Sequence, residues 1–238
     1  MRLSPMRVSP MRLFPVRLSP MRLSPALLIA FAAPALALQA PQREVARIVS
    51  PIWADEDSRD AAGEAANVIR LVGIGRGQTV ADIGAGSGYY TVRLPPVVGK
   101  TGRVIAQDIT PRYLADLKRR VRRAGLHNVG FVQGSAGDPK LPRGKVDAAL
   151  MIHMYHEIAQ PYALLGKLRA SLKPGGKLAI VDLDRASAAH GMPKALLVCE
   201  VRSVGYDLIS ITDLDPGYLA VFRPGKRADP AAVKACRG

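Results

Sequence analysis

Two histidines, a tyrosine and a glutamate stand close together in the segment 153–157, which reads His-Met-Tyr-His-Glu. Imidazole changes its charge near neutral pH, so a histidine here can take up or deliver a proton during a reaction. We predict His156 as the candidate catalytic base or substrate-orienting group, with Tyr155 shaping a pocket and Glu157 assisting. The alternative is that His156 and Glu157 only satisfy backbone groups of a loop.

Histidine and glutamate are also common metal ligands, but their order here does not favour a metal site. A helical zinc motif reads His-Glu-x-x-His, whereas this chain has His-x-x-His-Glu directly after an apolar run. His127 follows a predicted helix and His190 begins a loop, and neither lies in a recognisable partner motif. We therefore predict no metal.

A second group of residues is a glycine loop, Asp82-Ile-Gly84-Ala85-Gly86-Ser-Gly88. Glycines allow a sharp turn and a close approach of the backbone to a ligand, and a following helix presents its amide groups. A dinucleotide site favours G-x-G-x-x-G, with the third glycine one position later than here. A plain tight turn is the other interpretation.

An acid follows the glycine loop at the end of the next apolar run. Asp108, which precedes Ile109, stands 24 residues beyond Gly84. A carboxylate at this place can accept hydrogen bonds from both ribose hydroxyls of a nucleoside. The alternative is a helix-capping or surface aspartate.

These residues fall between elements that alternate along the chain. Apolar runs predict strands at 78–83, 102–109, 128–134, 145–152 and 177–184, and two further strands at 206–212 and 217–222 that we expect to pair as an antiparallel hairpin. Helices are predicted from Ser58 to Val72, from Thr110-Pro111 to Ala124, from Gln160-Pro161 to the segment 172–176, and over 193–204. The alternation predicts a doubly wound, mostly parallel α/β sheet with its site at the carboxyl ends of the strands.

The motifs DIGAGSGYY, VGKTGRVIAQDI and LKPGGKLAIVDLDR resemble those of the class I S-adenosylmethionine-dependent methyltransferases. The resemblance covers about Asp55 to Phe222 and is strongest to bacterial predicted methyltransferases that carry an export signal. It implies a Rossmann-like, seven-stranded, mostly parallel sheet over residues 42–224. It also implies S-adenosyl-L-methionine as the cofactor, bound by the following residues: Asp82, Gly84, Ala85, Gly86, Gly88, Asp108, Ile109, Ser135, Ala136 and His153.

The third strand end departs from the family pattern. Where the family often has Gly-Asp-Ala, with the aspartate meeting the adenine, this chain has Gly134-Ser135-Ala136 and an aspartate only at Asp138. Ser135 or the backbone of Ala136 can take over the adenine contact. Asp138 precedes Pro139 and is interpreted as a turn residue.

The resemblance implies methyl transfer to an unidentified, small-molecule acceptor. A non-catalytic S-adenosylmethionine or nucleoside-binding protein is the main alternative, and an NAD-linked oxidoreductase is disfavoured by the glycine spacing. The net charge is +15, of which residues 1–37 contribute five arginines, so the remainder keeps +10. No RNA-binding signature accompanies this charge, and we interpret it as a solvated basic surface without a nucleic-acid partner. Nothing in the sequence indicates the oligomeric state.

The first 25 residues repeat a five-residue unit of the MRLSP type, in which the regular prolines predict disorder. A start at Met21 would give a signal peptide over 21–37, with an apolar run from Ala26 to Ala33 and Ala35-Leu36-Ala37 as the cleavage site. We therefore predict export, in a bacterium to the periplasm, or a cytoplasmic location if the signal is not used. The apolar run is too short for a stable membrane span.

The chain has two cysteines. Cys199 lies on a predicted helix and is expected in the core, whereas Cys236 is expected to be exposed in a loose tail over 225–238. Export permits a disulfide between them without requiring one.

Overall fold

The computed structural model describes residues 45–48, 50, 52, 54–229 and 232–236, all of which belong to the unit Leu38–Gly238. The repeats over 1–25 and the predicted signal peptide over 21–37 lie outside the described residues. Within the part that the structure describes, no helix is long and apolar enough to cross a membrane.

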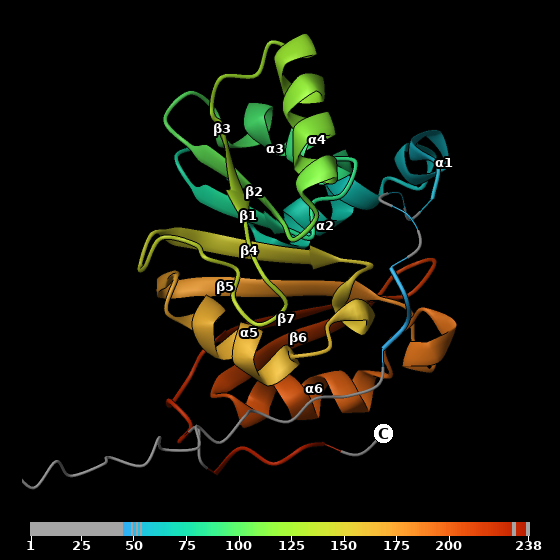
Figure 1. Cartoon of the computed structure of the whole chain (residues 1–238), viewed down its shortest axis with the longest axis vertical. Helices are drawn as coiled ribbons and strands as arrows, with labels where there is room; N and C mark the ends of the chain where they lie inside the picture. Colours follow the sequence, from blue (N-terminus) through green and yellow to red (C-terminus); the bar gives the residue numbers. More distant parts are fainter. Residues whose placement is uncertain (1–44, 49, 51, 53, 230–231, 237–238) are drawn as a thin grey trace, which may run out of the picture. The chain divides into compact units, whose positions relative to one another are not determined.

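A seven-stranded sheet organises the described unit, with strand order β3-β2-β1-β4-β5-β7-β6 (Figure 1). Neighbouring strands from β3 to β5 pair in parallel, and β7 pairs antiparallel with both β5 and β6. The strands are β1 (Thr79–Ile83), β2 (Arg103–Asp108), β3 (Val129–Gln133), β4 (Val146–Ile152), β5 (Leu172–Asp182), β6 (Tyr206–Asp213) and β7 (Tyr218–Pro224). The predicted fold class, including the C-terminal hairpin, is confirmed.

Helices cover both faces of this sheet, because alternate residues of the central strands are apolar on both sides. On one face, Ala149 and Met151 of β4 belong to a core with α5 (Pro161–Arg169) and α6 (Lys194–Ser203). On the other face, Ala148 and Leu150 of β4 pack in a core with α2 (Glu64–Val72) and α3 (Tyr89–Val98). Helix α4 (Pro111–Arg123) adds a third cluster beside β2 and β3.

The single helix predicted over 58–72 is in fact two, α1 (Glu56–Ala61) and α2. Gly63 breaks the helix because its φ of 64° is left-handed, a conformation that suits glycine and interrupts a right-handed helix. The predicted N-cap Ser58 lies inside α1, and its amide donates to the side chain of Asp55, the residue that caps the helix.

The LKPGG segment (172–176) belongs to a strand rather than to the end of a helix. Strand β5 begins at Leu172, which pairs with Val146, and the pairing resumes between Lys177 and Ala148 after a register shift. A bulge of this kind accommodates the intervening proline and glycines without ending the strand.

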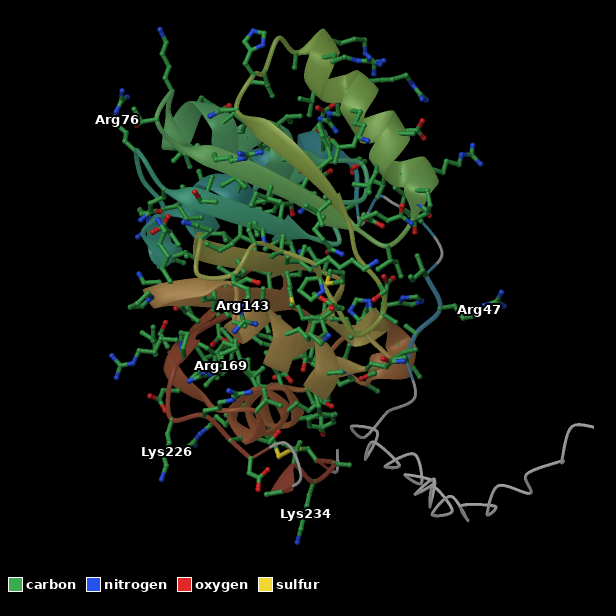
Figure 2. All side chains as sticks on the ribbon, turned by 60° about the vertical axis from the view of Figure 1, so that its left-hand side comes forward. Arg47, Arg76, Arg143, Arg169, Lys226 and Lys234 are labelled. Atoms are coloured by element: carbon green, nitrogen blue, oxygen red, sulfur yellow. A yellow bond between two sulfur atoms is a disulfide. The ribbon has the colours of Figure 1, made fainter. Side chains whose placement is uncertain are left out.

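The C-terminal segment has little regular structure but is fixed to the body, which corrects the expectation of a loose tail. Cys236 forms a disulfide with Cys199 of α6, and its amide donates to the Tyr162 hydroxyl at 2.7 Å (Figure 2). Cys199 is exposed rather than in the core. It lies on the side of α6 that faces the C-terminal segment with Cys236. The pairing that the sequence left open is therefore present.

Candidate functional site

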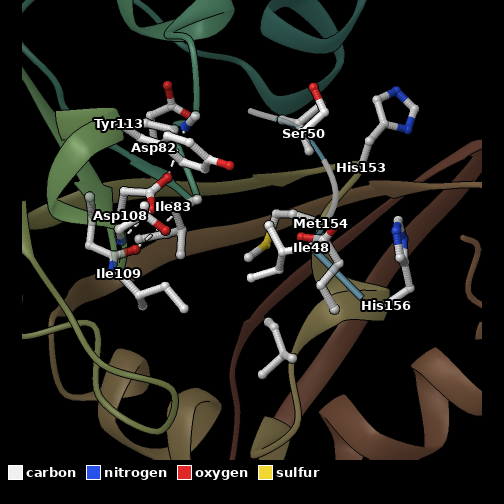
Figure 3. A pocket seen from close by; sticks show the side chains of 18 of the residues that line it. Ile48, Ser50, Asp82, Ile83, Asp108, Ile109, Tyr113, His153, Met154 and His156 are labelled. Carbon is white, nitrogen blue, oxygen red and sulfur yellow. Dashed lines mark hydrogen bonds between the residues drawn. The ribbon is translucent and has the colours of Figure 1, made fainter. Parts of the chain in front are cut away.

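A cavity of about 530 Å³ lies at the carboxyl ends of β1, β2 and β4, where the strand order reverses direction. This is the edge that the doubly wound topology predicts for a ligand. Figure 3 shows its two ends, with Asp82, Asp108 and Ile109 at one side and His153, Met154 and His156 at the other. Nine of the ten predicted cofactor-binding residues line it: Asp82, Gly84, Ala85, Gly86, Asp108, Ile109, Ser135, Ala136 and His153.

Gly88, the tenth, does not line the cavity and has a packing role instead. It caps the N-terminus of α3 with a φ of 89°, and a side chain at this position would collide with Leu117 of α4. Gly84, by contrast, meets the cavity directly. Its φ is 66°, and an added methyl group would lie 2.8 Å from the Met154 Cε. Any larger residue at Gly84 would therefore push Met154 and narrow the cavity.

Asp108 joins the glycine loop to the end of β2. Its Oδ2 accepts from the Gly86 amide at 2.9 Å and its Oδ1 from the Thr110 amide at 2.8 Å. The side chain is buried and lines the cavity. Since each carboxylate oxygen has two lone pairs, the acid is held in place by the backbone and can still accept hydrogen bonds from a ligand.

Asp82, on β1, is buried next to Asp108 and receives a hydrogen bond from the Thr91 hydroxyl at 2.6 Å. Burial raises the pKa of Asp82 to about 6, the charge of Asp108 adds to this, and the Thr91 hydrogen bond opposes it. The two acids therefore differ in what holds them: Asp108 is held by backbone amides, and Asp82 by the Thr91 hydroxyl.

The third strand end contributes to the cavity wall. Ser135 and Ala136 line the cavity, and Ser135 forms an isolated bridge with Asp138. The Asp138 carboxylate turns away from it, accepting from the Lys140 amide and from the Lys167 ammonium group. Asp138 is therefore a turn residue, as its position before Pro139 indicates.

His153 follows β4 with a left-handed φ of 52°, so the strand does not continue through Met154. The turn brings its Nε2 within 3.5 Å of the Glu64 carboxylate on α2. Glu64 also receives hydrogen bonds from the Arg59 guanidinium group and from the Tyr90 hydroxyl. Burial raises the pKa of Glu64, but the hydrogen bonds and charges of His153 and Arg59 outweigh it and lower the pKa to about 2.

The same network places Arg59 at the cavity wall. Its guanidinium carbon lies 3.7 Å from the centre of the Tyr89 ring, and the side chain is buried. Arg59 lines the cavity, whereas Asp60 binds Tyr89 and Arg93 outside it.

His156 is buried on the short 3₁₀ helix Tyr155–Glu157 and is held by an acid from β5. Its Nδ1 lies 2.9 Å from the Asp182 Oδ1, and its amide donates to the Asp182 Oδ2. Glu157 is half-buried, and burial raises its pKa to about 7 while the His156 charge opposes this. Both His156 and Glu157 line the cavity, as the sequence predicts.

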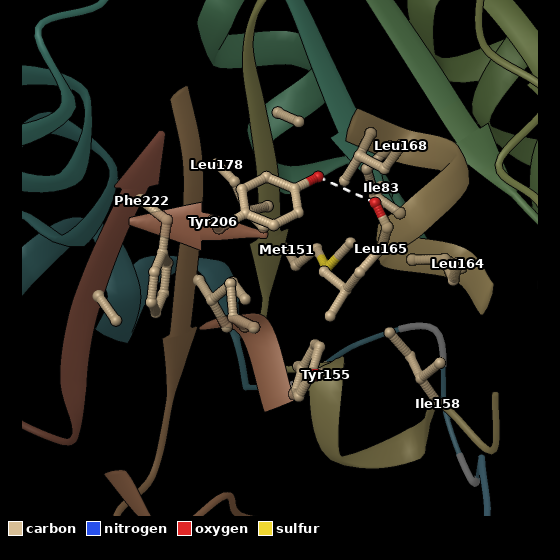
Figure 4. Close-up of a cluster of buried hydrophobic side chains, with 14 of the residues drawn as sticks. Ile83, Met151, Tyr155, Ile158, Leu164, Leu165, Leu168, Leu178, Tyr206 and Phe222 are labelled. Carbon is tan, nitrogen blue, oxygen red and sulfur yellow. Dashed lines mark hydrogen bonds between the residues drawn. The ribbon is translucent and has the colours of Figure 1, made fainter. Parts of the chain in front are cut away.

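Tyr155 does not shape the pocket, which corrects the prediction. Its ring is fully buried in the core on the α5 and α6 face, near Met151 and Leu165 (Figure 4). Its hydroxyl donates to the buried Glu200 carboxylate of α6 at 2.8 Å. After His153 the chain forms a 3₁₀ turn instead of continuing as a strand with alternating side chains. Tyr155 therefore points into the core, and His156 points to the cavity.

Sequence reasoning missed Gln107, Asp182 and His190. Gln107 accepts from the Gly84 amide at 3.3 Å, and Asp182 holds His156. Both stand at carboxyl ends of strands, so the strand-end rule could have indicated them. His190 reaches the cavity from a loop after β5, and its ring lies 5.6 Å from that of His156. No local signal in the sequence indicates His190, yet the structure brings it next to His156 and Glu157.

Part of the chain is similar in sequence to known methyltransferases. Residues 80–176 match the model of a family described as a methyltransferase domain. The ubiquinone/menaquinone biosynthesis C-methyltransferase UbiE of Salmonella arizonae is 31% identical over 114 residues, which cover 48% of this chain and 45% of that protein. The same values hold for the UbiE protein of Salmonella paratyphi B. The chain thus spans about half the length of the curated relatives that it matches.

Solved structures show the same fold. A SAM-dependent methyltransferase from Aquifex aeolicus superimposes with a TM-score of 0.64 at 21% identity, covering 71% of this chain and 98% of that one. The [4+2]-cyclase SpnF gives a TM-score of 0.61 at 17% identity, covering 79% and 87%. At such identities the likeness concerns the fold alone, and the second protein carries a name other than methyltransferase.

Proposed function

We propose that the chain is a class I S-adenosylmethionine-dependent methyltransferase and that it transfers a methyl group to a small-molecule acceptor. One observation carries the proposal. A single cavity has the amide-held carboxylate of Asp108 at one end and the Asp182-held imidazole of His156 at the other. A nucleoside-recognising end and a proton-accepting end are the two parts that such a reaction needs.

The residues at the first end fit S-adenosylmethionine. Asp108 keeps lone pairs for ribose hydroxyls, Gly84 leaves room that a side chain would fill, and the exposed Ile109 offers an apolar surface to a base. Arg59 and His153 also line the cavity, where Arg59 adds a positive group and His153 a hydrogen-bonding group. The cofactor, when bound, supplies a methyl group already activated by its sulfonium charge.

The second end would receive the acceptor. Ile48, Ile52 and Met154 give it apolar walls, and His156 and Glu157 are its polar groups. This mixture suits a partly apolar molecule with one ionisable atom. His156 orients that atom or accepts its proton. The quinone-related name of the curated relatives makes ring-containing acceptors the first class to test.

We also propose that the protein works outside the cytoplasm. The Cys199–Cys236 disulfide supports this, because disulfides persist in oxidising compartments and are rare in the cytosol. The signal-like segment 21–37 supports it from the sequence. Purification of the native chain from separated periplasmic and cytoplasmic fractions would test it, and recovery only from the cytoplasm would contradict it.

A methyl-transfer screen tests the activity. The purified chain is incubated with S-adenosylmethionine radiolabelled on the methyl group and with extracts or panels of quinones, phenols and amines. We expect label to move to a small molecule, and to be lost in the Asp108→Ala variant. Cofactor binding without transfer to any component would instead support the non-catalytic binding protein.

A further inference from the structure

Three potential metal ligands from two separate segments converge at the acceptor end of the cavity. His156, Glu157 and His190 each offer one ligand atom, and these atoms all lie within 4.8 Å of one another. All three residues line the cavity, so a bound ion would be accessible to a small molecule. Two imidazole nitrogens and one carboxylate oxygen form the ligand set of catalytic zinc sites that keep a fourth position open.

The strongest support is the residue behind the first ligand. Both carboxylate oxygens of the fully buried Asp182 lie about the same distance from the His156 Nδ1, at 2.9 and 3.0 Å. Metal-binding histidines almost always give their second ring nitrogen to a carboxylate or carbonyl, which fixes the tautomer. Here Nδ1 is committed to Asp182, and Nε2 is left with its lone pair.

The other two ligands are positioned by their own segments. His190 ends the 3₁₀ helix Ser187–Ala189, and its carbonyl accepts from the Arg185 guanidinium group, which fixes the backbone beside the cavity. Its ring stands at 89° to that of His156. Among the described residues, no lysine or arginine forms an ion pair with the half-buried Glu157.

We infer that His156, Glu157 and His190 bind a divalent transition-metal cation of the Zn²⁺ type, with Asp182 as the residue that positions His156. Imidazole and carboxylate ligands suit such ions better than Mg²⁺ or Ca²⁺, which favour all-oxygen sites. Tetrahedral ligand bonds of about 2.0–2.2 Å place ligand atoms about 3.3–3.6 Å apart, so the three atoms have to close by up to about 1.5 Å from their present spread. Side-chain rotation of Glu157 and His190, which are not fully buried, can supply this movement.

The binding of the ion is independent of the proposed methyl transfer, but its role rests on that proposal. A metal ion at this place narrows the acceptor to a molecule with a hydroxyl group. The ion lowers the pKa of a hydroxyl bound at its open position, and the proton leaves to solvent. The acceptor oxygen then forms a bond to the methyl carbon while the methyl–sulfur bond breaks and its electron pair stays on sulfur. The products are a methyl ether and S-adenosylhomocysteine. In this arrangement His156 serves as a ligand rather than as the base.

Metal binding can be measured without any activity. Untagged chain is stripped with EDTA, dialysed, and titrated with ZnCl₂ by calorimetry and with CoCl₂ by visible absorption. We expect one ion per chain and the absorption bands of a nitrogen- and oxygen-ligated Co²⁺. His190→Gln and Glu157→Gln should each weaken binding by more than about tenfold, and Asp182→Asn by about 10- to 100-fold.

His127→Gln is the matched control, because His127 is exposed and distant in sequence from the three ligands. It should bind the ion like the unaltered chain. Circular dichroism and thermal unfolding of the metal-free variants confirm that they are folded. The absence of saturable binding by the unaltered chain, or equal affinity in the control and in both ligand variants, would overturn the inference.

The same titrations in Asp108→Ala separate this inference from the proposed function. Asp108 lies at the cofactor end, so its loss should leave the metal affinity unchanged. Metal binding without S-adenosylhomocysteine binding would refute methyl transfer and leave the metal site standing. If the chain binds no ion, and EDTA changes neither cofactor binding nor methyl transfer, the metal site is refuted and the proposed methyl transfer stands.

Discussion

The Nδ1 of His156 lies 2.9 Å from one carboxylate oxygen of Asp182 and 3.0 Å from the other, and both side chains are almost completely buried. The two residues come from neighbouring strand ends, β4 and β5, that are 26 positions apart in the sequence. Because Nδ1 lies against Asp182, Nε2 is the imidazole nitrogen that is left to interact with a substrate or a metal ion. It supports His156 equally as a proton acceptor and as a metal ligand.

Replacement of Asp182 by asparagine should lower the rate of methyl transfer by about 10- to 100-fold, because an amide can no longer hold the imidazole tautomer. Affinity for S-adenosylhomocysteine should stay unchanged, because Asp182 is not at the cofactor end of the cavity. Steady-state kinetics and calorimetry measure the two effects. Because a structural defect would leave the shape of the pH–rate profile intact, a changed profile identifies a positioning role. An unaltered rate would contradict it.

Tyr155→Phe should lower the free energy of unfolding by about 1–3 kcal/mol, because it leaves the buried Glu200 carboxylate without this hydroxyl donor. Urea denaturation measures the loss. Cofactor affinity and the rate of methyl transfer at a temperature where the variant is folded should not change. A variant with normal stability but impaired methyl transfer would show that Tyr155 acts in the pocket rather than in the core.

The disulfide should stabilise the fold by up to about 3–4 kcal/mol, because it closes a loop with a sequence separation of 37 residues. We expect Cys199→Ser/Cys236→Ser to unfold at lower urea concentration than the oxidised chain. Its midpoint should match that of the reduced unaltered chain. Identical midpoints for the oxidised and the reduced chain would show that the Cys199–Cys236 disulfide contributes nothing to stability.

Glu64 should make stability depend on pH in the acid range. Its pKa in the fold is about 2, below the ordinary value of 4.5, so the carboxylate form favours folding. Its contribution is present in full above pH 4.5 and is lost as the pH falls toward 2. The difference in unfolding free energy between the unaltered chain and Glu64→Gln should therefore shrink over that interval. A difference that is constant with pH would show that the Glu64 charge does not stabilise the fold.

The sheet and the cofactor end could be predicted from the sequence because their signals are local. The apolar run 79–83, the glycines after it and Asp108 at the next strand end follow one another in a short stretch, and the parallel topology dictates that strand ends share one edge. The packing of Gly88 against Leu117, 29 positions away, was not predicted, because such a contact is not visible in a loop motif.

The acceptor end could be predicted only in part. His156 and Glu157 were found because they follow an apolar strand, but Tyr155 was misplaced because strand alternation does not anticipate the left-handed turn at His153. His190 reaches His156 through a loop whose course depends on contacts such as that between Arg185 and its carbonyl. Such long-range convergence leaves no periodic trace in the sequence.

Calorimetric titration with S-adenosylhomocysteine is the most direct test of the central claim that this cavity is a cofactor site. The unaltered chain should bind one molecule. Asp108→Ala should weaken binding by about tenfold or more, since hydrogen bonds to a charged group contribute about 1.5–3 kcal/mol. Asp116→Ala, which removes an exposed acid of α4, is the matched control and should bind normally. No binding by the unaltered chain, or equal binding by all three proteins, would contradict the account.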